Sequence, residues 1–209
     1  MADAVVIGGG GHAKVLIAVL RKLGWSIVGY TDRDDRGVIL GAARLGSDDA
    51  LAGVLAGHPG CAALVGVGKV DGSSLRLRLQ RAAAAVGFET PVVVSPHSVV
   101  NEEVRLGAGT MVFDGVIVNS GAQTGDACIL NTNATIEHDC ILGDDVHVAP
   151  GATVSGGVRI GDHCMIGAGA TVIHGVSICA GSVVGAGAVV VADVSEPGVY
   201  VGSPARRLS

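Results

Sequence analysis

Residues 92–193 divide without a break into seventeen sixes: VVVSPH, SVVNEE, VRLGAG, TMVFDG, VIVNSG, AQTGDA, CILNTN, ATIEHD, CILGDD, VHVAPG, ATVSGG, VRIGDH, CMIGAG, ATVIHG, VSICAG, SVVGAG and AVVVAD. The third position is Val, Leu or Ile in sixteen of them, with Thr124 as the exception. The first position is always small or β-branched. A branched third residue suits the inward face of a short strand, and a small first residue lets the chain turn at a corner. This period therefore predicts short strands stacked in a repetitive coil.

The pattern resembles the hexapeptide-repeat family, whose fold is a left-handed parallel β-helix with three sixes per coil. The resemblance implies about six coils stacked about 4.8 Å apart, as strands in a sheet are. It also implies a homotrimer, with acyl-CoA lying in the groove between two of the prisms.

The composition agrees with tightly stacked backbone. The chain has 34 glycines, but only one Trp, two Tyr and two Phe. A formal net charge of −5 and so few aromatic rings argue against nucleic-acid binding. No apolar run approaches the ~18 residues of a membrane span, and the N-terminus lacks the basic region of a signal peptide. We therefore expect a cytoplasmic protein with neither nucleic-acid nor membrane partners.

Three cysteines share one position of the repeat. Cys128, Cys140 and Cys164 are all first residues of their sixes, and the chain has no CxxC pair. We expect small buried side chains here rather than disulfides or metal ligands, and no metal cofactor.

The residues before the repeat form a different kind of domain. They alternate short apolar runs with helical stretches, as parallel α/β units do. The expected strands are Val5–Ile7, Ser26–Tyr30 and Ala62–Val67, and the expected helices are Ala13–Leu23 and Ser73–Val86. We predict a small Rossmann-like domain over residues 1–90 and a β-helix with a C-terminal tail over residues 91–209.

The repeat is most sharply interrupted at Glu137-His138-Asp139, on a corner where Gly, Ala and Asn otherwise predominate. With eighteen residues per coil, His138 stacks between Ser120 and Gly156. An imidazole titrates near the working pH and suits a general base in acyl transfer. Asp139 would hold the ring, and the Gly156 N–H would donate to the developing oxyanion. Asn119, diagonal to His138, either positions the sugar amine or is a hydrogen-bonded turn residue.

Three stretches together narrow the resemblance to one branch of the family. GGGGH at residues 8–12, YTD at 30–32 and EHD at 137–139 resemble the bacterial nucleotide-sugar N-acetyltransferases. These enzymes acetylate the C4 amine of a 4-amino-4,6-dideoxy sugar and are closely related to the sialic acid O-acetyltransferases. The resemblance covers essentially the whole chain and implies acetyl-CoA as cosubstrate.

Site residues follow from the same resemblance. It makes His138 the base and Asp139 its orienting acid, although some members carry glutamate at the second position. It places His147 at the acetyl end of acetyl-CoA, and Ala168 and Ala186 along the pantetheine path. In the C-terminal tail, Arg206 and Arg207 either bind the 3′-phosphate of CoA or are solvated.

The N-terminal glycine loop follows one expected strand and opens a helix, where backbone N–H groups can meet phosphates. Gly8, Gly10 and Ala13 satisfy GxGxxA, and Asp32 ends the second strand where a ribose-binding acid belongs. Taken alone, the loop indicates a dinucleotide site.

Together with the prism, the loop instead favours the diphosphate of a sugar nucleotide. The residues assigned to this substrate are Gly10, Gly11 and His12 near the phosphates and sugar, and Asp32 and Arg33 near the ribose or base. Gly66 and Gly68 are expected at the same rim, where Lys69 would neutralise phosphate. His163 and His174 are expected to be solvated turn residues, since neither has an acidic partner in the repeat pattern.

Three classes of function stay open from the sequence. The favoured one is N-acetylation of a nucleotide-linked amino sugar, with O-acetylation of a sialic-type sugar as its variant. The second is a trimeric β-helix zinc hydratase, in which His138 and His147 would be ligands. The third is a non-catalytic nucleotide-binding regulator or a nicotinamide enzyme.

Overall fold

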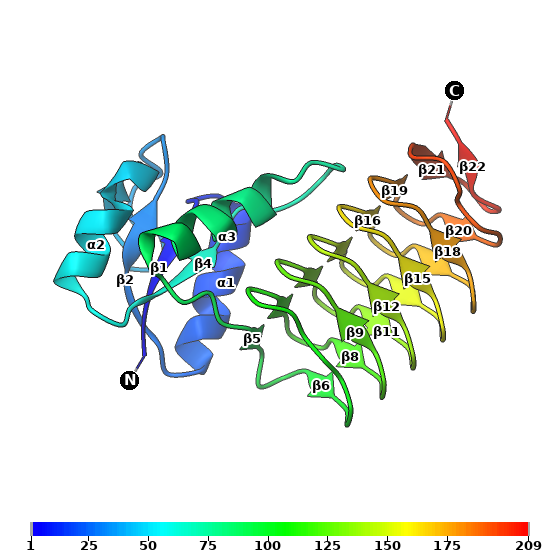
Figure 1. The fold of residues 1–209 in the computed structure, drawn as a ribbon, viewed down its shortest axis with the longest axis horizontal. Helices are drawn as coiled ribbons and strands as arrows, with labels where there is room; N and C mark the ends of the chain where they lie inside the picture. The colour runs from blue at the N-terminus through cyan, green and yellow to red at the C-terminus, as the bar shows by residue number, and fades with distance from the viewer. Residues whose placement is uncertain (1, 209) are drawn as a thin grey trace. The chain divides into compact units, whose positions relative to one another are not determined.

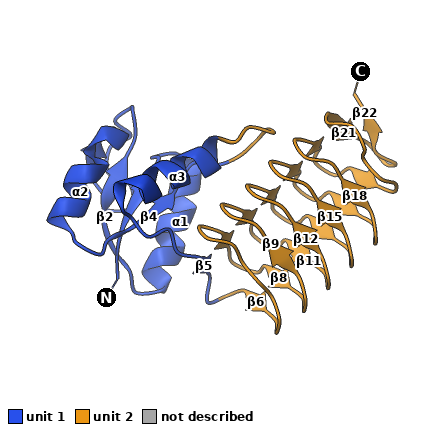
Figure 2. Cartoon of the chain, in the orientation of Figure 1, with its two compact units in different colours: residues 1–68, 75–96 blue, residues 69–74, 97–209 orange. Residues whose placement is uncertain are grey.

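The computed structural model describes residues 2–208, which pack as two compact units (Figure 2). The first unit holds the residues up to Gly68 together with Leu75–Pro96, and the second holds Lys69–Ser74 and the residues from His97 onward. The sequence did not predict that residues 69–74 pack with the second unit. A domain boundary at residue 90 stays a prediction, because packing in one structure does not measure independent folding.

The first unit is a four-stranded parallel sheet with helices (Figure 1). Its strands are β1 (Asp3–Ile7), β2 (Ser26–Thr31), β3 (Arg44–Gly46) and β4 (Ala62–Val65), in the order β3-β2-β1-β4. Its helices are α1 (Gly11–Lys22), the 3₁₀ turn η1 (Asp48–Ala50), α2 (Leu51–Gly57) and α3 (Leu75–Val86), and β5 (Val93–Val94) follows them.

This order is typical of one half of a Rossmann fold, which confirms the predicted fold of this part. Residues Ala4 to Ile7 of the central strand β1 are at most 1 % exposed, as parallel strands covered on both faces are. The structure adds β3, η1 and α2, which the sequence interpretation did not include.

The second unit is a left-handed parallel β-helix, as predicted (Figure 1). Its strands are β6 (Val99–Val100), β7 (Met111–Val112), β8 (Ile117–Val118), β9 (Gln123–Thr124), β10 (Ile129–Leu130), β11 (Thr135–Ile136), β12 (Ile141–Leu142), β13 (His147–Val148), β14 (Thr153–Val154), β15 (Arg159–Ile160), β16 (Met165–Ile166), β17 (Thr171–Val172), β18 (Ser177–Ile178), β19 (Val183–Val184) and β20 (Val189–Val190). The tail adds β21 (Val199–Val201), parallel to β19, and β22 (Arg206–Arg207), antiparallel to β21.

Pairing confirms eighteen residues per coil. Ile129 pairs with His147, and His147 pairs with Met165, eighteen residues apart in each case. The three stacked sheets contain β7-β10-β13-β16-β19, β6-β8-β11-β14-β17-β20 and β9-β12-β15-β18. The third-position side chains of the strands form the core; Val112, Ile136 and Val148, for example, are fully buried.

The sixth position of each repeat has a conformation that sequence alone did not reveal. From residue 103 to residue 187 every sixth position has positive φ, and glycine occupies nine of them. The other six are Glu103, Ala127, Asn133, Asp139, Asp145 and His163. A non-glycine residue in this left-handed region costs about 1–2 kcal/mol. The side chains at these six positions therefore occupy places where glycine would be less strained.

Among residues 2–208, no helix has the length and apolar character that a membrane crossing requires.

Candidate active site

His138 and Asp139 form a hydrogen-bonded pair on the corner between β11 and β12. The His138 Nδ1 lies 2.9 Å from the Asp139 Oδ2, and both side chains are largely exposed. An ionised carboxylate only accepts hydrogen bonds, so Nδ1 carries the proton in the neutral ring. The free electron pair is then on Nε2, the arrangement that a general base requires.

Two glycines make room for this pair. A Cβ on Gly156 would lie 2.5 Å from the His138 Nε2, and a Cβ on Gly121 would lie 2.6 Å from the Asp139 Oδ1. Both distances are shorter than van der Waals contact, so any side chain at either position would displace the pair. The predicted stacking of His138 on Gly156 is thus present, and Gly121 is a further site residue that the sequence interpretation missed.

Backbone bonds hold the corner in register with its neighbours. The Asp139 N–H donates to the Ser120 carbonyl, and the Gly157 N–H donates to the His138 carbonyl. The Asn119 Oδ1 accepts a hydrogen bond from the Asn101 Nδ2 at 2.7 Å, and a contact of Asn119 with the sugar amine stays a prediction.

A polar hollow of about 560 Å³ adjoins Asp139. Glu103, Arg105 and Gln123 line it together with Gly121. The hollow combines carboxylate, guanidinium and amide groups next to the His138–Asp139 pair. Sequence reasoning missed it, although the eighteen-residue period aligns Glu103 with Gly121 and Asp139.

Ala168 and Ala186 are exposed and lie one coil apart, on the corners after β16 and β19. The Gly187 N–H donates to the Ala168 carbonyl, which fixes this stacking. They occupy a different corner of the prism from His138, which follows β11. Within one chain, the structure therefore does not bring these alanines to the His138 corner.

His147 is buried on the outward face of β13, with 7 % of its surface exposed. Its Nδ1 lies 2.7 Å from the Lys69 carbonyl oxygen, and its Nε2 lies 3.1 Å from the Asn131 Nδ2. Both ring nitrogens are therefore engaged within the protein. A contact to acetyl-CoA through either nitrogen would require one of these bonds to break.

The glycines of the N-terminal loop divide into two kinds. Gly8 has φ +101°, and a Cβ there would lie 2.6 Å from the Val67 side chain. Gly9 is packed against the Tyr30 ring. By contrast, a Cβ on Gly10 or Gly11 would meet nothing within 4 Å. Gly8 and Gly9 thus shape the loop, and Gly10 and Gly11 leave space where a ligand can approach the backbone.

The helix α1 begins where the sequence indicated a phosphate site. Gly10 is its N-cap and makes no side-chain cap, Gly11 is its first residue, and His12 is its second. The first N–H groups of a helix have no partner within the helix and point toward its N-terminal end. This end of α1 is therefore suited to an anion.

Asp32 fixes the glycine loop. Its Oδ2 accepts from the Gly9 N–H at 2.8 Å, and its Oδ1 accepts from the Asp34 N–H at 3.0 Å. Partial burial alone would raise the pKa of Asp32. The two N–H donors, together with the charges of Arg36 and Arg44, outweigh that effect and hold the pKa of this carboxyl below its ordinary value.

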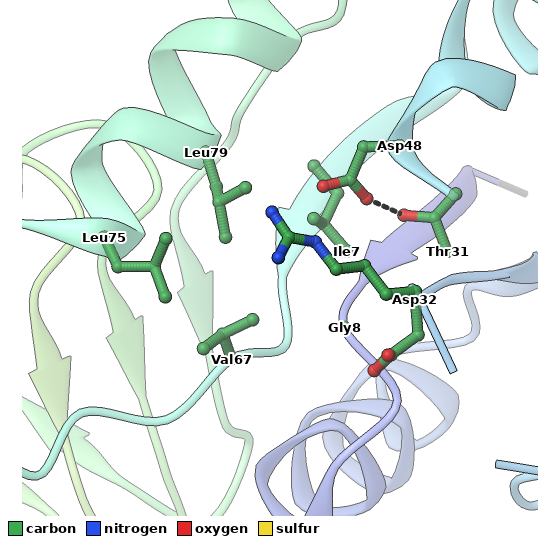
Figure 3. A pocket seen from close by; sticks show the side chains of 9 residues that line it. Ile7, Gly8, Thr31, Asp32, Asp48, Val67, Leu75 and Leu79 are labelled. Carbon is green, nitrogen blue, oxygen red and sulfur yellow. Dashed lines mark hydrogen bonds between the residues drawn. The ribbon is translucent and has the colours of Figure 1, made fainter. Parts of the chain in front are cut away.

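Asp32 also borders a pocket of about 310 Å³ in the first unit (Figure 3). Ile7, Gly8, Thr31, Arg33, Asp48, Val67, Leu75 and Leu79 complete the lining. The Thr31 hydroxyl donates to the Asp48 Oδ1 at 2.6 Å on one side (Figure 3). The structure thus brings Gly8, Asp32 and Arg33 together at one hollow of mixed apolar and polar character. Sequence reasoning missed Thr31 and Asp48.

Two sequence predictions are wrong. Lys69 does not face phosphate at the glycine rim, since its ammonium is buried and lies 3.1 Å from the Asp145 Oδ2. His163 does have an acidic partner, because its Nδ1 lies 3.4 Å from the same Asp145 oxygen. The second pair was readable in the sequence, since Asp145 and His163 are eighteen residues apart.

Gly66 and the tail arginines have structural contacts. A Cβ on Gly66 would lie 2.5 Å from Val6, so this glycine allows close packing at the end of β4. Arg207 pairs with Glu196 at 3.1 Å and donates to the Pro197 carbonyl. Arg206 is exposed and bonds only to the neighbouring Ala205 carbonyl among the contacts described.

Four of the five cysteines are buried, and Cys179 is partly exposed. Burial raises the pKa of the Cys128 thiol to about 12 and that of Cys164 to about 11. All five cysteines are free. Within residues 2–208, no cluster of three His, Cys, Asp or Glu side chains is arranged to hold a metal ion.

Family models match both parts of the chain. Residues 121–156 match the bacterial transferase hexapeptide model (six repeats), and residues 157–192 match the hexapeptide repeat of succinyl-transferase. Residues 3–77 match the PglD N-terminal domain. No curated protein sequence matches the chain significantly.

Solved structures match the chain over its whole length. A histidine variant of perosamine N-acetyltransferase from Caulobacter crescentus, in complex with CoA and GDP-perosamine, is 39 % identical with a TM-score of 0.94, over 100 % of this chain and 98 % of that one. The acetyltransferase domain of PglB from Neisseria gonorrhoeae is 34 % identical with a TM-score of 0.92, over 100 % of both chains. WeeI from Acinetobacter baumannii is 26 % identical with a TM-score of 0.87, also over 100 % of both chains.

The identities, the complete coverage and the two matching domain types agree with the branch that GGGGH, YTD and EHD indicated. The chain belongs to the hexapeptide-repeat acetyltransferases with a PglD-type N-terminal domain, the family of perosamine N-acetyltransferase and the PglB acetyltransferase domain.

Proposed function

We propose that the protein transfers the acetyl group of acetyl-CoA to the C4 amine of a nucleotide-linked 4-amino-4,6-dideoxy sugar. The observation that carries this proposal is the full-length similarity to perosamine N-acetyltransferase, whose structure contains CoA and GDP-perosamine. The exposed His138–Asp139 pair supplies the base that such a reaction needs.

The proposed chemistry begins with attack of the amine on the thioester carbonyl. A C–N bond forms, and the carbonyl oxygen gains negative charge, which the Gly156 N–H beside His138 would stabilise. His138 Nε2 takes the proton that the nitrogen loses, and Asp139 stabilises the resulting imidazolium. The C–S bond then breaks, and the proton passes from His138 to the departing CoA thiolate. The products are the acetamido sugar and CoA.

The sugar nucleotide is assigned to the first unit. Gly10 and Gly11 leave the N-terminus of α1 open to a diphosphate, and His12 follows them in the helix. The pocket beside Asp32 and Arg33 would take the ribose or base. Because the Asp32 oxygens already accept from Gly9 and Asp34, a ribose hydroxyl would use their second electron pairs.

The acetyl-CoA site is assigned to the β-helix, and we infer that it lies between two copies of the chain. His138 and the alanines Ala168 and Ala186 lie on different corners of one prism. Two prisms side by side would let the His138 corner of one meet the alanine corner of its neighbour. A homotrimer repeats this contact three times in a closed ring, as cyclic symmetry requires.

The alternative functions have less support. O-acetylation of a sialic-type sugar would use the same His138–Asp139 pair, but the similar enzyme named for its reaction is an N-acetyltransferase. A zinc hydratase would need His147 as a ligand, and both of its ring nitrogens are engaged by Lys69 and Asn131.

We also infer a cytoplasmic location, because acetyl-CoA and sugar nucleotides are cytoplasmic metabolites.

The test is CoA thiol release from acetyl-CoA with a panel of acceptors. The panel holds GDP- and UDP-linked 4-amino-4,6-dideoxy sugars, with the corresponding 4-hydroxy sugars as matched controls. We expect thiol release with an amino sugar only. Release with no amino sugar, or faster release with a hydroxyl acceptor, would overturn the proposal. Titration with UDP, GDP and CMP then identifies the base, and sedimentation gives the number of subunits.

A further inference from the structure

Residues Lys69–Ser74 lie between β4 and α3 in sequence but pack with the β-helix (Figure 2). We call these six residues the anchor segment. Gly72 lies against the backbone of Gly181, so closely that a Cβ on Gly72 would be 2.8 Å from the Gly181 carbonyl oxygen. At its other end, Lys69 contacts the coils that hold Asp145 and His147. The anchor segment thus crosses several coils.

A buried ion pair holds the first residue of the anchor segment. The Lys69 Nζ lies 3.1 Å from the Asp145 Oδ2, and these side chains are 2 % and 0 % exposed. Lys69 also donates to the Ser73 carbonyl, which ties the two ends of the segment together. An ammonium group this deeply buried requires its carboxylate, because removing one partner leaves an uncompensated charge.

His147 holds the backbone of the same residue. A carbonyl oxygen only accepts, so the His147 Nδ1 carries the proton and donates to the Lys69 carbonyl at 2.7 Å. The Nε2 then accepts from the Asn131 Nδ2 at 3.1 Å. The ring therefore has one tautomer and one orientation, and Lys69 is held by both its side chain and its backbone.

Asp145 is strained in this role. It has φ +54° at the sixth position of its repeat, where glycine is the usual residue. Residues in such conformations persist where the surroundings hold them, and they concentrate at functional sites. His163, one coil further on, contacts the same carboxylate oxygen as Lys69.

The residues that flank the anchor segment line the pocket of the first unit. Val67 precedes it by two residues and Leu75 follows it directly, and both side chains face the pocket that Gly8 and Asp32 border (Figure 3). Fixing a six-residue segment at its start restricts both flanking residues, because chain connectivity limits where they can move.

We propose that Lys69, Asp145 and His147 are positioning residues for the acceptor substrate. They hold the anchor segment on the β-helix and thereby fix the Val67 and Leu75 side of the sugar-nucleotide pocket. This inference rests on the proposed function for the identity of the ligand. It gives His147 a role in docking Lys69, and the expected contact of His147 with acetyl-CoA stays a prediction.

The structure supplies a mild way to break the anchor. Asp145→Gly introduces the residue that nine other sixth positions carry, so the coil keeps its preferred backbone. Ala127→Gly is the matched control, since Ala127 is the buried sixth-position residue one coil earlier, with φ +58°. Asp145→Asn is the second variant, because asparagine also tolerates this conformation.

The first readout does not depend on activity. The chain contains only three lysines, Lys14, Lys22 and Lys69, and Lys69 is 4 % exposed. A lysine-specific protease should leave the bond after Lys69 intact in the wild type and in Ala127→Gly. It should cut there in Asp145→Gly and Asp145→Asn, with the fragments identified by mass. If the bond after Lys69 resists the protease equally in all four proteins, Asp145 does not hold the anchor segment.

The second readout separates positioning from general damage. For Asp145→Gly and Asp145→Asn we expect KM for the amino-sugar nucleotide to rise by about tenfold or more, with KM for acetyl-CoA changed by less than about twofold. An unchanged acceptor KM, or equal rises in both KM values, would overturn the positioning role. If the wild type acetylates no amino sugar, the proposed function fails, and protease cleavage still decides whether Asp145 anchors Lys69.

Discussion

The imidazole of His138 lies over the backbone of Gly156, one coil further along the β-helix, and a Cβ on Gly156 would come within 2.5 Å of its Nε2. The nitrogen that would remove a proton from the substrate therefore has its position only because residue 156 has no side chain. Glycine is needed here for its small size and not for its backbone freedom, since its φ is not positive.

A methyl group at position 156 should displace the imidazole of His138, the proposed base. For Gly156→Ala we expect kcat to fall about 10²-fold, the cost of moving a catalytic group by about 1 Å, with KM for acetyl-CoA nearly unchanged. Steady-state kinetics and a thermal melt check this. Gly53→Ala, in helix α2 where a Cβ meets nothing within 4 Å, is the control and should keep full activity. Wild-type kcat in Gly156→Ala would show that the ring works from another position.

Removing the imidazole should affect chemistry more than binding. His138→Asn should lower kcat by about 10² or more, because general-base catalysis contributes about 10²–10⁴. Its dissociation constant for CoA, measured by calorimetry, should stay close to that of the wild type. His58→Asn, at a half-exposed histidine of the first unit, serves as the control. If the His138→Asn variant turns over at the wild-type rate, the amine loses its proton directly to solvent.

The two kinds of glycine in the N-terminal loop should respond differently. Gly8→Ala should destabilise the fold by about 1–3 kcal/mol, since it combines a φ of +101° with a clash against Val67. Gly10→Ala should cost no more than about 1 kcal/mol of stability, because alanine is a poorer N-cap than glycine. It should raise KM for the sugar nucleotide, because its Cβ points into open space where we place the diphosphate. Denaturant melts of both variants measure the change in stability, and steady-state kinetics measure the KM for the sugar nucleotide. A stable Gly8→Ala, or an unchanged KM in Gly10→Ala, would contradict the division.

Alkaline pH should destabilise the β-helix through its buried thiols. Burial raises the pKa of Cys128 from its ordinary 9.0 to about 12 and that of Cys164 to about 11, so the folded state keeps protons that the unfolded state loses. Their contribution to stability is thus complete below pH 9 and disappears as the pH rises through 11 to 12. Denaturant melts between pH 8 and pH 11 should show a steeper loss for the wild type than for a Cys128→Ala, Cys164→Ala double variant. If stability falls equally steeply with pH in the two proteins, ionisation of these thiols does not cause the loss of stability.

Much of the fold and part of the site followed from local patterns. The branched third position and the period of six predicted the β-helix, because every coil buries its core with the same few residues. The alternation of strand and helix predicted the first unit. The break at EHD predicted the His138–Asp139 pair, since adjacent residues on an exposed corner need no distant contact to meet.

Contacts between residues far apart in the sequence could not be predicted from local patterns. Lys69 and Asp145 are 76 residues apart, and neither residue breaks a local pattern that would link it to the other. Lys69 was therefore wrongly assigned to phosphate, and the hydrogen bond between His147 and the Lys69 carbonyl was not predicted; the assignment of His147 to acetyl-CoA stays a prediction. The Asp145–His163 pair was missed for another reason, since the eighteen-residue period aligns the two and was not applied to them.

The sequence by itself determined the prism, its coil length and the corner that carries His138, because these depend on a repeated choice of side-chain size and shape along consecutive residues. Only the tertiary structure decided that Gly156 and Gly121 frame the His138–Asp139 pair, that Gly10 is open where Gly8 is packed, and that Lys69 is buried. Those features depend on which atoms meet across coils and loops. These features are determined by packing distances and by the need to neutralise a buried charge. A sequence pattern contains no information on either.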